Sequence, residues 1–237
     1  RELKFIHNSV SSLNISTNVD LIDIQGNGNQ LSSIDVSQCT NLESLQIGSN
    51  LISSVDVSNN LILESLGFYG LNISSLDVSN NTLLKYLNGG MNALPSIDIS
   101  NNPDLVSLSL EQNQLSSIDL SNNNLIQYLH IGGNSISTID VSNLSDLYSF
   151  KIWDNQLASI DVTNSPLLNL LNCNGNQQIL SIDLSNNVDL EELYLNSNQI
   201  SNIDLSNNIK LERVFLSENQ LSTLVMNNHS FLEDLSC

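Results

Sequence analysis

Apolar residues recur along the chain at fixed intervals, and these intervals define a repeating frame. In the segment 42–60, positions 1, 4, 6, 11, 14 and 16 of the frame are Leu42, Leu45, Ile47, Ile52, Val55 and Val57. Ten such frames start at residues 21, 42, 63, 84, 105, 126, 147, 168, 190 and 211. Eight of the nine steps between them are 21 residues, and the step from 168 to 190 is 22. The extra residue falls near Gln177 and Gln178, where we expect a small bulge in the loop.

The frame predicts a stack of coils, because one coil cannot bury its own apolar side. Positions 4 and 6 have the spacing of a strand with one buried face. Positions 14 to 17 read Ile-Asp-Val-Ser or a close variant, which indicates a second extended piece with Asp outward. We expect a single domain over 1–237, with partial coils at 1–20 and 232–237 and no polar caps. Uncapped strand edges would permit end-to-end self-association.

The frame resembles the leucine-rich repeat, whose signature L-x-x-L-x-L-x-x-N is matched by Leu105, Leu108, Leu110 and Asn113. The short coil and its I/L-D-V/L-S-x-N tail are similar to bacterial surface repeats of the internalin J-like subfamily. That subfamily places Cys at position 6, whereas here only Cys173 and Cys237 do so. The resemblance implies a right-handed, helix-poor coil with a parallel β-sheet on the concave face and short extended or 3-10 segments on the back. Because two extended faces both repeat at about 4.8 Å, we expect gentle curvature.

The charge balance excludes some classes of partner. The chain carries 25 acidic and 6 basic residues, for a formal net charge of -19. Such a surface repels phosphate backbones and anionic lipid, so nucleic acid and membrane surfaces are poor partners. There is no apolar run of about 18 residues that could insert into a bilayer. An acidic, Lys-poor, Asn-rich repeat of this kind fits an extracellular or cell-surface protein.

Two polar columns in the frame are interpreted as structural. Position 9 is Asn in nine of the ten coils, and we expect each amide to bond backbone groups of its own coil and the next. Leu71 is the exception. The nine members of this column are Asn29, Asn50, Asn92, Asn113, Asn134, Asn155, Asn176, Asn198 and Asn219.

Position 15 is Asp in nine consecutive coils, and stacked carboxylates about 4.8 Å apart repel by roughly 0.9 kcal/mol per pair even in water. Capping of the following turn by each Asp would offset that repulsion. A row of Ca²⁺ ions is the alternative, although one Asp per coil supplies few ligands. No other cofactor is expected. The column comprises Asp35, Asp56, Asp77, Asp98, Asp119, Asp140, Asp161, Asp183 and Asp204.

The first strand of each coil presents its outward residues at positions 2, 3, 5, 7 and 8. All five tyrosines, the single tryptophan and five of the six basic residues fall there: Arg1, Lys4, Lys85, Lys151 and Arg213 are the basic ones. Strands favour aromatic residues in any case, but Tyr, Trp and Arg also anchor interfaces. We therefore predict an aromatic and basic ligand-binding stripe with Trp153 as its central anchor. Its residues are Tyr69, Lys85, Tyr86, Tyr128, His130, Tyr148, Lys151, Trp153, Asp154, Tyr194, Arg213 and Phe215.

These observations favour a binding module over an enzyme. Ser109, His130 and Lys151 share position 5, but an open strand face offers no orienting acid, oxyanion site or enclosed pocket. His7 and His229 lack zinc-ligand spacing. The leading hypothesis is recognition of a protein partner in adhesion or attachment.

Two alternatives stay open. The first is carbohydrate binding, with sugars stacked on Tyr and Trp and their hydroxyls bonded by Asn88, Asn172, Asn174 and Asn196. The second is a passive spacer. The frame also predicts that the three cysteines, Cys39, Cys173 and Cys237, are free thiols.

Overall fold

The structure, a computed structural model, describes all 237 residues and consists of strands, turns and irregular segments. The chain forms two compact units, Arg1–Leu125 and Ile126–Cys237. There is no helix of the length and apolarity that a membrane span requires. The prediction of a single domain over the whole chain, with gentle curvature, stays a prediction.

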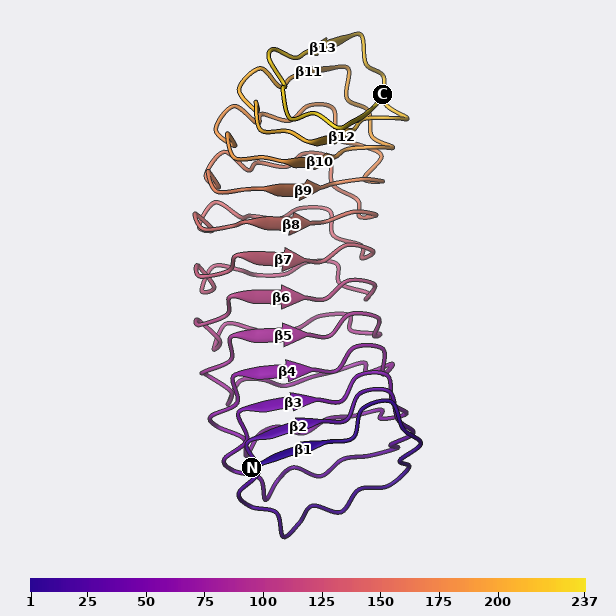
Figure 1. Cartoon of the computed structure of the whole chain (residues 1–237), viewed down its shortest axis with the longest axis vertical. Coiled ribbons are helices and arrows are strands. Elements are labelled where there is room, and N and C mark those ends of the chain that lie inside the picture. Colours follow the sequence, from indigo (N-terminus) through magenta and orange to yellow (C-terminus); the bar gives the residue numbers. More distant parts are fainter. The chain divides into compact units, whose positions relative to one another are not determined.

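The first unit is a stack of short parallel strands, each three residues long and each one coil further along the chain (Figure 1). Leu45 pairs with Leu66 in the next strand, so position 4 stays on one side of the stack. The strands are β1 (Glu2–Lys4), β2 (Asp23–Gln25), β3 (Ser44–Gln46), β4 (Ser65–Gly67), β5 (Tyr86–Asn88) and β6 (Ser107–Ser109). The predicted parallel sheet is confirmed here.

The second unit repeats this arrangement and adds a two-stranded sheet on the other side of the coil. Its main strands, paired in parallel and in this order, are β7 (Tyr128–His130), β8 (Ser149–Lys151), β9 (Leu170–Asn172), β10 (Glu192–Tyr194), β12 (Arg213–Phe215) and β14 (Asp234–Ser236). The second sheet pairs β11 (Asn202–Asp204) with β13 (Thr223–Val225). In earlier coils the corresponding segment, positions 13 to 17 of the frame, forms neither a paired strand nor a 3-10 turn. The predicted back segments are therefore paired strands only in the last two complete coils.

The core follows the apolar frame. In the coil that starts at residue 42, Leu42, Leu45, Ile47 and Ile52 are fully buried. Val55, at position 14, is only half-buried. Each buried aliphatic side chain contributes about 1.5–3 kcal/mol, and every coil repeats the set, so stacking supplies the stability that a single coil lacks.

Glycine at core position 6 is explained by a ring in the preceding coil. A Cβ on Gly89 would lie 2.1 Å from Cζ of Phe68, and one on Gly26 would lie 2.4 Å from Cζ of Phe5. Phe68 is fully buried. The ring fills the space that an aliphatic residue fills in other coils, so these glycines keep the core packed.

The asparagines at position 9 are bonded as predicted, but to the preceding coil. The amide of Asn50 donates to the carbonyl oxygens of Gly26 (2.9 Å) in the preceding coil and of Ile47 (2.8 Å) in its own coil. Its carbonyl oxygen accepts from the Leu31 N–H at 3.0 Å, again in the preceding coil. We expected hydrogen bonds to the following coil, and this expectation was wrong. The Asn50 side chain points toward the preceding coil, where Gly26 and Leu31 are its partners.

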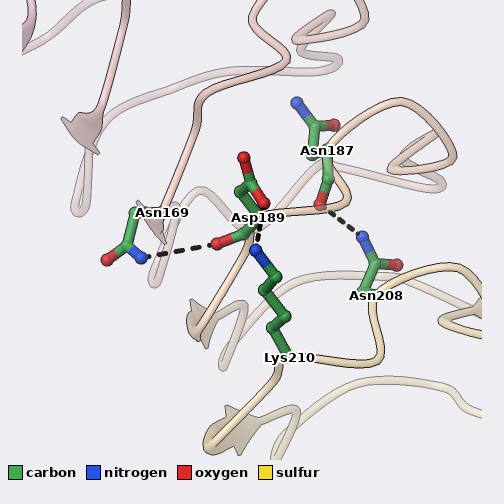
Figure 2. A network of polar contacts seen from close by, with 5 residues as sticks. All are labelled: Asn169, Asn187, Asp189, Asn208 and Lys210. Carbon is green, nitrogen blue, oxygen red and sulfur yellow. Dashed lines mark hydrogen bonds and ion pairs between the residues drawn. The ribbon is translucent and has the colours of Figure 1, made fainter.

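A second buried asparagine column lies at position 19, and our sequence reading missed it. Asn208 donates to the carbonyl oxygens of Asn187 (2.8 Å) and Leu184 (3.0 Å), as Figure 2 shows for the first of these. The side-chain oxygens of these asparagines have no hydrogen-bond partner. The column comprises Asn60, Asn81, Asn102 and Asn123 in the first unit and Asn187 and Asn208 in the second. Its signal in the sequence is the recurring Ser-Asn-Asn.

Position 8 is left-handed in every coil, whatever the residue. Gly28 and Gly70 have φ of 68° and 67°, but Ser49 and Gln112 have φ of 55° and 53° at the same position. Left-handed backbone is strained for residues with a Cβ. Gln177, at the predicted insertion, is also left-handed, with φ 58°, and it lies between the buried Asn176 and Ile179.

We expect Gln112→Gly to stabilise the protein by about 0.5–1 kcal/mol, because glycine removes the strain of the left-handed backbone. The Gln112 side chain is exposed, so little contact is lost. The matched control is Gln114→Gly, two residues later, where φ is not positive and glycine should destabilise. Thermal unfolding followed by circular dichroism measures both changes. Equal shifts for the two variants would contradict the assignment of strain to position 8.

Candidate functional site

The densest group of predicted site residues lies on the strand face of the second unit. Tyr128 and Tyr148 are 39% and 43% exposed, and their ring centroids are 5.9 Å apart with planes at 59°. Both rings point outward from the buried residues Leu129 and Leu147. A tilted aromatic pair of this kind forms a firm apolar surface in contact with solvent.

Trp153 lies flat against the neighbouring coil because that coil has a glycine beneath it. A Cβ on Gly132 would lie 2.4 Å from Nε1 and from Cε2 of the indole, so no other residue would fit there. The indole is half-buried, and its N–H donates to no protein acceptor. Trp153 therefore has a fixed position and an unused hydrogen-bond donor.

Lys151 is the one basic side chain that forms no ion pair. Lys85 pairs with Glu64 at 2.9 Å, and Arg213 pairs with Glu192 at 2.9 Å. Figure 2 shows the corresponding pair of Lys210 with Asp189, at 2.5 Å. Arg1 and Lys4 likewise have acidic partners. The predicted stripe is aromatic, but most of its positive charge is neutralised by carboxylates of the chain itself.

His130 is not a cation near pH 7. Burial, and then the neighbouring Lys151 ammonium group, lower the pKa of His130 to about 4. Its Nε2 lies 3.0 Å from Oγ of Ser149. His130 pairs with Lys151 across β7 and β8, so the neutral imidazole lies directly beside the one cation that has no carboxylate partner.

Asp154 belongs to a turn. It is one of the left-handed residues at position 8, with φ 47°, and its carboxylate lies where a Cβ on Gly175 would be. Its side chain is exposed beside Trp153. The left-handed backbone of Asp154 was not foreseen, and its part in ligand binding stays a prediction.

The predicted residues near the C-terminal end form a self-contained cluster. Tyr194 and Phe215 stack with centroids 5.2 Å apart and planes at 4°. The Tyr194 hydroxyl donates to Glu192 at 2.7 Å. Burial, then the hydrogen bond to Glu192, raises the pKa of Tyr194, and the Glu192 carboxylate raises the pKa of Arg213. The polar groups of this cluster are occupied, so it offers a ligand mainly its ring faces.

The predicted site residues of the first unit are Tyr69, Lys85 and Tyr86, and no hydrogen bond, ion pair or ring contact among their side chains is seen. The Tyr69 ring lies 3.1 Å from where a Cβ on Gly90 would be, and its hydroxyl contacts the sulfur of Met91. Tyr86 is 50% exposed. The hydrogen bond to Glu64 raises the pKa of Lys85. Of these three, only the two tyrosines are open to a ligand.

A pocket of about 220 Å³ opens on the same face of the first unit, and the sequence reading missed it. Gly48 and Gly67 lie at its base, and Asn27, Gln46, Tyr69 and Asn88 surround them. The available signal was Gly67, the single glycine at outward position 5 of the ten coils, directly after a coil with glycine (Gly48) at outward position 7.

Comparison with solved structures identifies the fold independently of the repeat pattern. No protein-family model matches the sequence, and no curated protein matches it. The functional domain of internalin J from Listeria monocytogenes, described as including a cysteine ladder, superimposes with a TM-score of 0.95 at 31% identity. The match covers 99% of this chain and 52% of that chain. The chain belongs to the leucine-rich-repeat proteins and is similar to internalin J.

Other leucine-rich-repeat structures extend this comparison. Internalin F from Listeria monocytogenes has 26% identity and a TM-score of 0.77, covering 98% of this chain and 85% of that chain. The ectodomain of the plant receptor kinase GASSHO1 from Arabidopsis thaliana has a TM-score of 0.77 at 20% identity, covering 95% of this chain and 35% of that chain. The latter shows the fold alone. This leucine-rich-repeat chain spans about half the length of the internalin J domain.

The cysteines of this leucine-rich-repeat chain are free thiols, as predicted. Cys173 is fully buried at core position 6, and burial raises its pKa. Cys39 is buried in the position-19 column, where burial, then Asp35, raises its pKa. Cys237 is exposed. The buried pair has the character of small core residues.

The aspartates at position 15 cap turns, as predicted. In all nine coils the carboxylate accepts the backbone N–H of the residue two places later at 2.9 Å. Hydrogen bonds from that residue lower the pKa of every one of these aspartates. No group of three or more His, Cys, Asp or Glu suited to a metal ion occurs in the 237 residues. The calcium alternative is an untested prediction.

Proposed function

We propose that this leucine-rich-repeat domain binds a protein partner through Tyr128, Tyr148, Lys151 and Trp153 on the second unit. We call these four residues the Trp153 cluster. The observation that carries the proposal is Lys151: the chain pairs every other basic side chain with a carboxylate, and the exception stands among exposed rings. Aromatic anchors around a charge with no internal partner are typical of interface centres.

The partner that fits this cluster presents an apolar surface with a carboxylate near its centre. The rings of Tyr128 and Tyr148 would cover apolar side chains, and Lys151 would pair with the carboxylate. The free indole N–H of Trp153 would donate to a backbone carbonyl. Because Trp153 is held against Gly132, little side-chain entropy is lost on binding.

The related structures support a protein ligand at the level of the fold. The plant receptor ectodomain is in complex with Casparian strip integrity factor 2, and another plant leucine-rich-repeat receptor is in complex with the peptide hormone RGF2. Together with the similarity to internalin J, this supports a secreted or cell-surface bacterial protein used in attachment, which binds and does not catalyse.

A photo-reactive residue at Tyr148 tests this proposal. We expect p-benzoylphenylalanine at Tyr148 to cross-link a protein displayed on host or neighbouring bacterial cells. The same residue at Ser142, outside the strand face, serves as the control and should cross-link nothing. If neither position captures a protein, the spacer hypothesis is favoured.

Affinity measurements on the captured partner then test the cluster. We expect Trp153→Ala to weaken binding about 30-fold, as for a central anchor. Lys151→Met should weaken binding about tenfold and reduce its dependence on salt, because the variant loses the charge and keeps most of the side chain. Gln156→Ala, an exposed neighbour outside the cluster, is the control. Unchanged affinity in both cluster variants would remove the cluster from the interface.

A further inference from the structure

The pocket on the first unit exists because two outward side chains are missing. Gly48 and Gly67 occupy outward positions of adjacent coils, and both are buried at the base of the pocket. A Cβ on Gly67 would lie 2.0 Å from Oε1 of Gln46, so the Gln46 amide lies over this glycine. A Cβ on Gly48 would lie 2.9 Å from the backbone oxygen of Tyr69 and 3.3 Å from Oδ1 of Asn27, which is its nearest side-chain atom. The two glycines thus bring two side-chain oxygens to the base of one hollow.

Several outward or core glycines of the chain are covered by aromatic rings, whereas no ring lies over Gly48 or Gly67. Trp153 covers Gly132, Tyr69 covers Gly90, and Phe68 fills the space beside Gly89. The Tyr69 ring lies against Gly90, and only the backbone of Tyr69 lies next to Gly48, with its carbonyl oxygen 2.9 Å from where a Cβ on Gly48 would be. The hollow is therefore a consequence of where the Tyr69 ring is held.

The polar groups around the pocket are positioned and largely unused. The Gln46 amide donates to the Ser65 hydroxyl at 2.9 Å, which fixes its oxygen over Gly67. The side-chain amides of Asn27 and Asn88 form no hydrogen bond within the protein. An amide offers both a donor and an acceptor, which is the pair of functions that an alcohol hydroxyl needs from its site.

The lining carries no charged residue, although the chain as a whole has a net charge of -19. A charged ligand would therefore find no counter-ion in the pocket. The volume of about 220 Å³ is below the range of roughly 300–1,000 Å³ that drug-sized ligands use, which suits one small ring. The Tyr69 ring provides an apolar wall for the C–H face of such a ring.

We propose that this pocket binds one neutral sugar ring of a glycan, with hydroxyls bonded by Asn27, Gln46 and Asn88 and one face against Tyr69. This glycan site goes beyond the proposed protein interface and lies on other residues. Each of the two proposals can fail without the other.

The experiment titrates the whole domain with methyl glycosides of glucose, galactose, mannose and N-acetylglucosamine, followed by ligand-observed nuclear magnetic resonance. Glucuronate and sialic acid are the charged comparison. We expect saturable millimolar binding of at least one neutral glycoside and none of the acids. Asn88→Ala should weaken binding about fivefold to tenfold through the lost hydrogen bond, whereas Ser109→Ala in the next strand should leave it unchanged.

Two further variants test the shape of the pocket. Gly67→Val fills the base with little backbone conflict, because the nearest atoms belong to the flexible end of Gln46, and it should abolish measurable binding. Tyr69→Phe keeps the ring and should bind as before, whereas Tyr69→Ala should lose most of the affinity. Absence of any saturable neutral sugar would overturn the proposal. So would equal affinity in wild type, Asn88→Ala and Gly67→Val, or preference for the acids. Trp153→Ala should leave sugar binding unchanged, which separates this test from that of the protein interface.

Discussion

Replacement of Asn50 by leucine should lower the free energy of unfolding by about 3 kcal/mol or more. The amide of Asn50 is bonded to carbonyl oxygens of two coils, and its own oxygen accepts the Leu31 N–H. Leucine has a similar volume but satisfies none of these groups. Each buried polar group left without a partner costs roughly 1–3 kcal/mol, and at least two would be left in Asn50→Leu.

Urea unfolding followed by circular dichroism measures this loss. The matched control is Asn59→Leu, the same substitution at an exposed asparagine in the same coil, which should change stability by less than about 0.5 kcal/mol. In a repeat protein a local defect can also separate the transition into steps, so the slope must be compared with that of the wild type. A loss below 1 kcal/mol for Asn50→Leu would show that the column does not hold neighbouring coils together.

The fold could be predicted from the sequence because the same apolar and polar pattern occurs in each of ten coils. The apolar frame located the strands, and the asparagine and aspartate columns were assigned to structural roles that the hydrogen bonds confirm. The left-handed backbone at position 8 was not foreseen, because residues as different as Gly28, Met91 and Glu218 occupy it. Backbone conformation there is imposed by the stack, so residue identity carries little signal.

The candidate site was only partly predictable, because its properties depend on contacts between outward residues of adjacent coils, and we considered each outward residue by itself. The frame placed Lys85 and Glu64 at the same position of adjacent coils, so their ion pair could have been inferred from the repeat. A count of basic residues on the face hid this neutralisation and overstated its positive charge. The pocket was missed for the opposite reason: Gly48 and Gly67 carry no chemistry themselves, and their effect lies in what they leave open.

Gly89, at core position 6, is another glycine whose importance the sequence does not reveal. Its replacement is the second substitution for which we expect a large loss of stability. Gly89→Val should lower the free energy of unfolding by about 3 kcal/mol, because its Cβ would lie 2.1 Å from Cζ of the fully buried Phe68. Without that contact the substitution would be favourable, because the backbone at Gly89 is not left-handed and valine loses less conformational entropy on folding than glycine. A destabilised variant therefore reports crowding in the core.

A double-mutant cycle with Phe68→Ala separates crowding from other causes. Phe68→Ala alone should cost about 3–5 kcal/mol through the cavity it leaves, and Gly89→Val places a side chain in that space. The double variant should be about 2 kcal/mol more stable than the sum of the single losses predicts, as for residues in direct contact. Additive losses would mean that position 6 requires glycine for its backbone conformation and that contact with Phe68 is not the cause. A favourable coupling would show that the Phe68 ring and Gly89 fit each other across adjacent coils. At this site the two neighbouring coils would then pack as one unit.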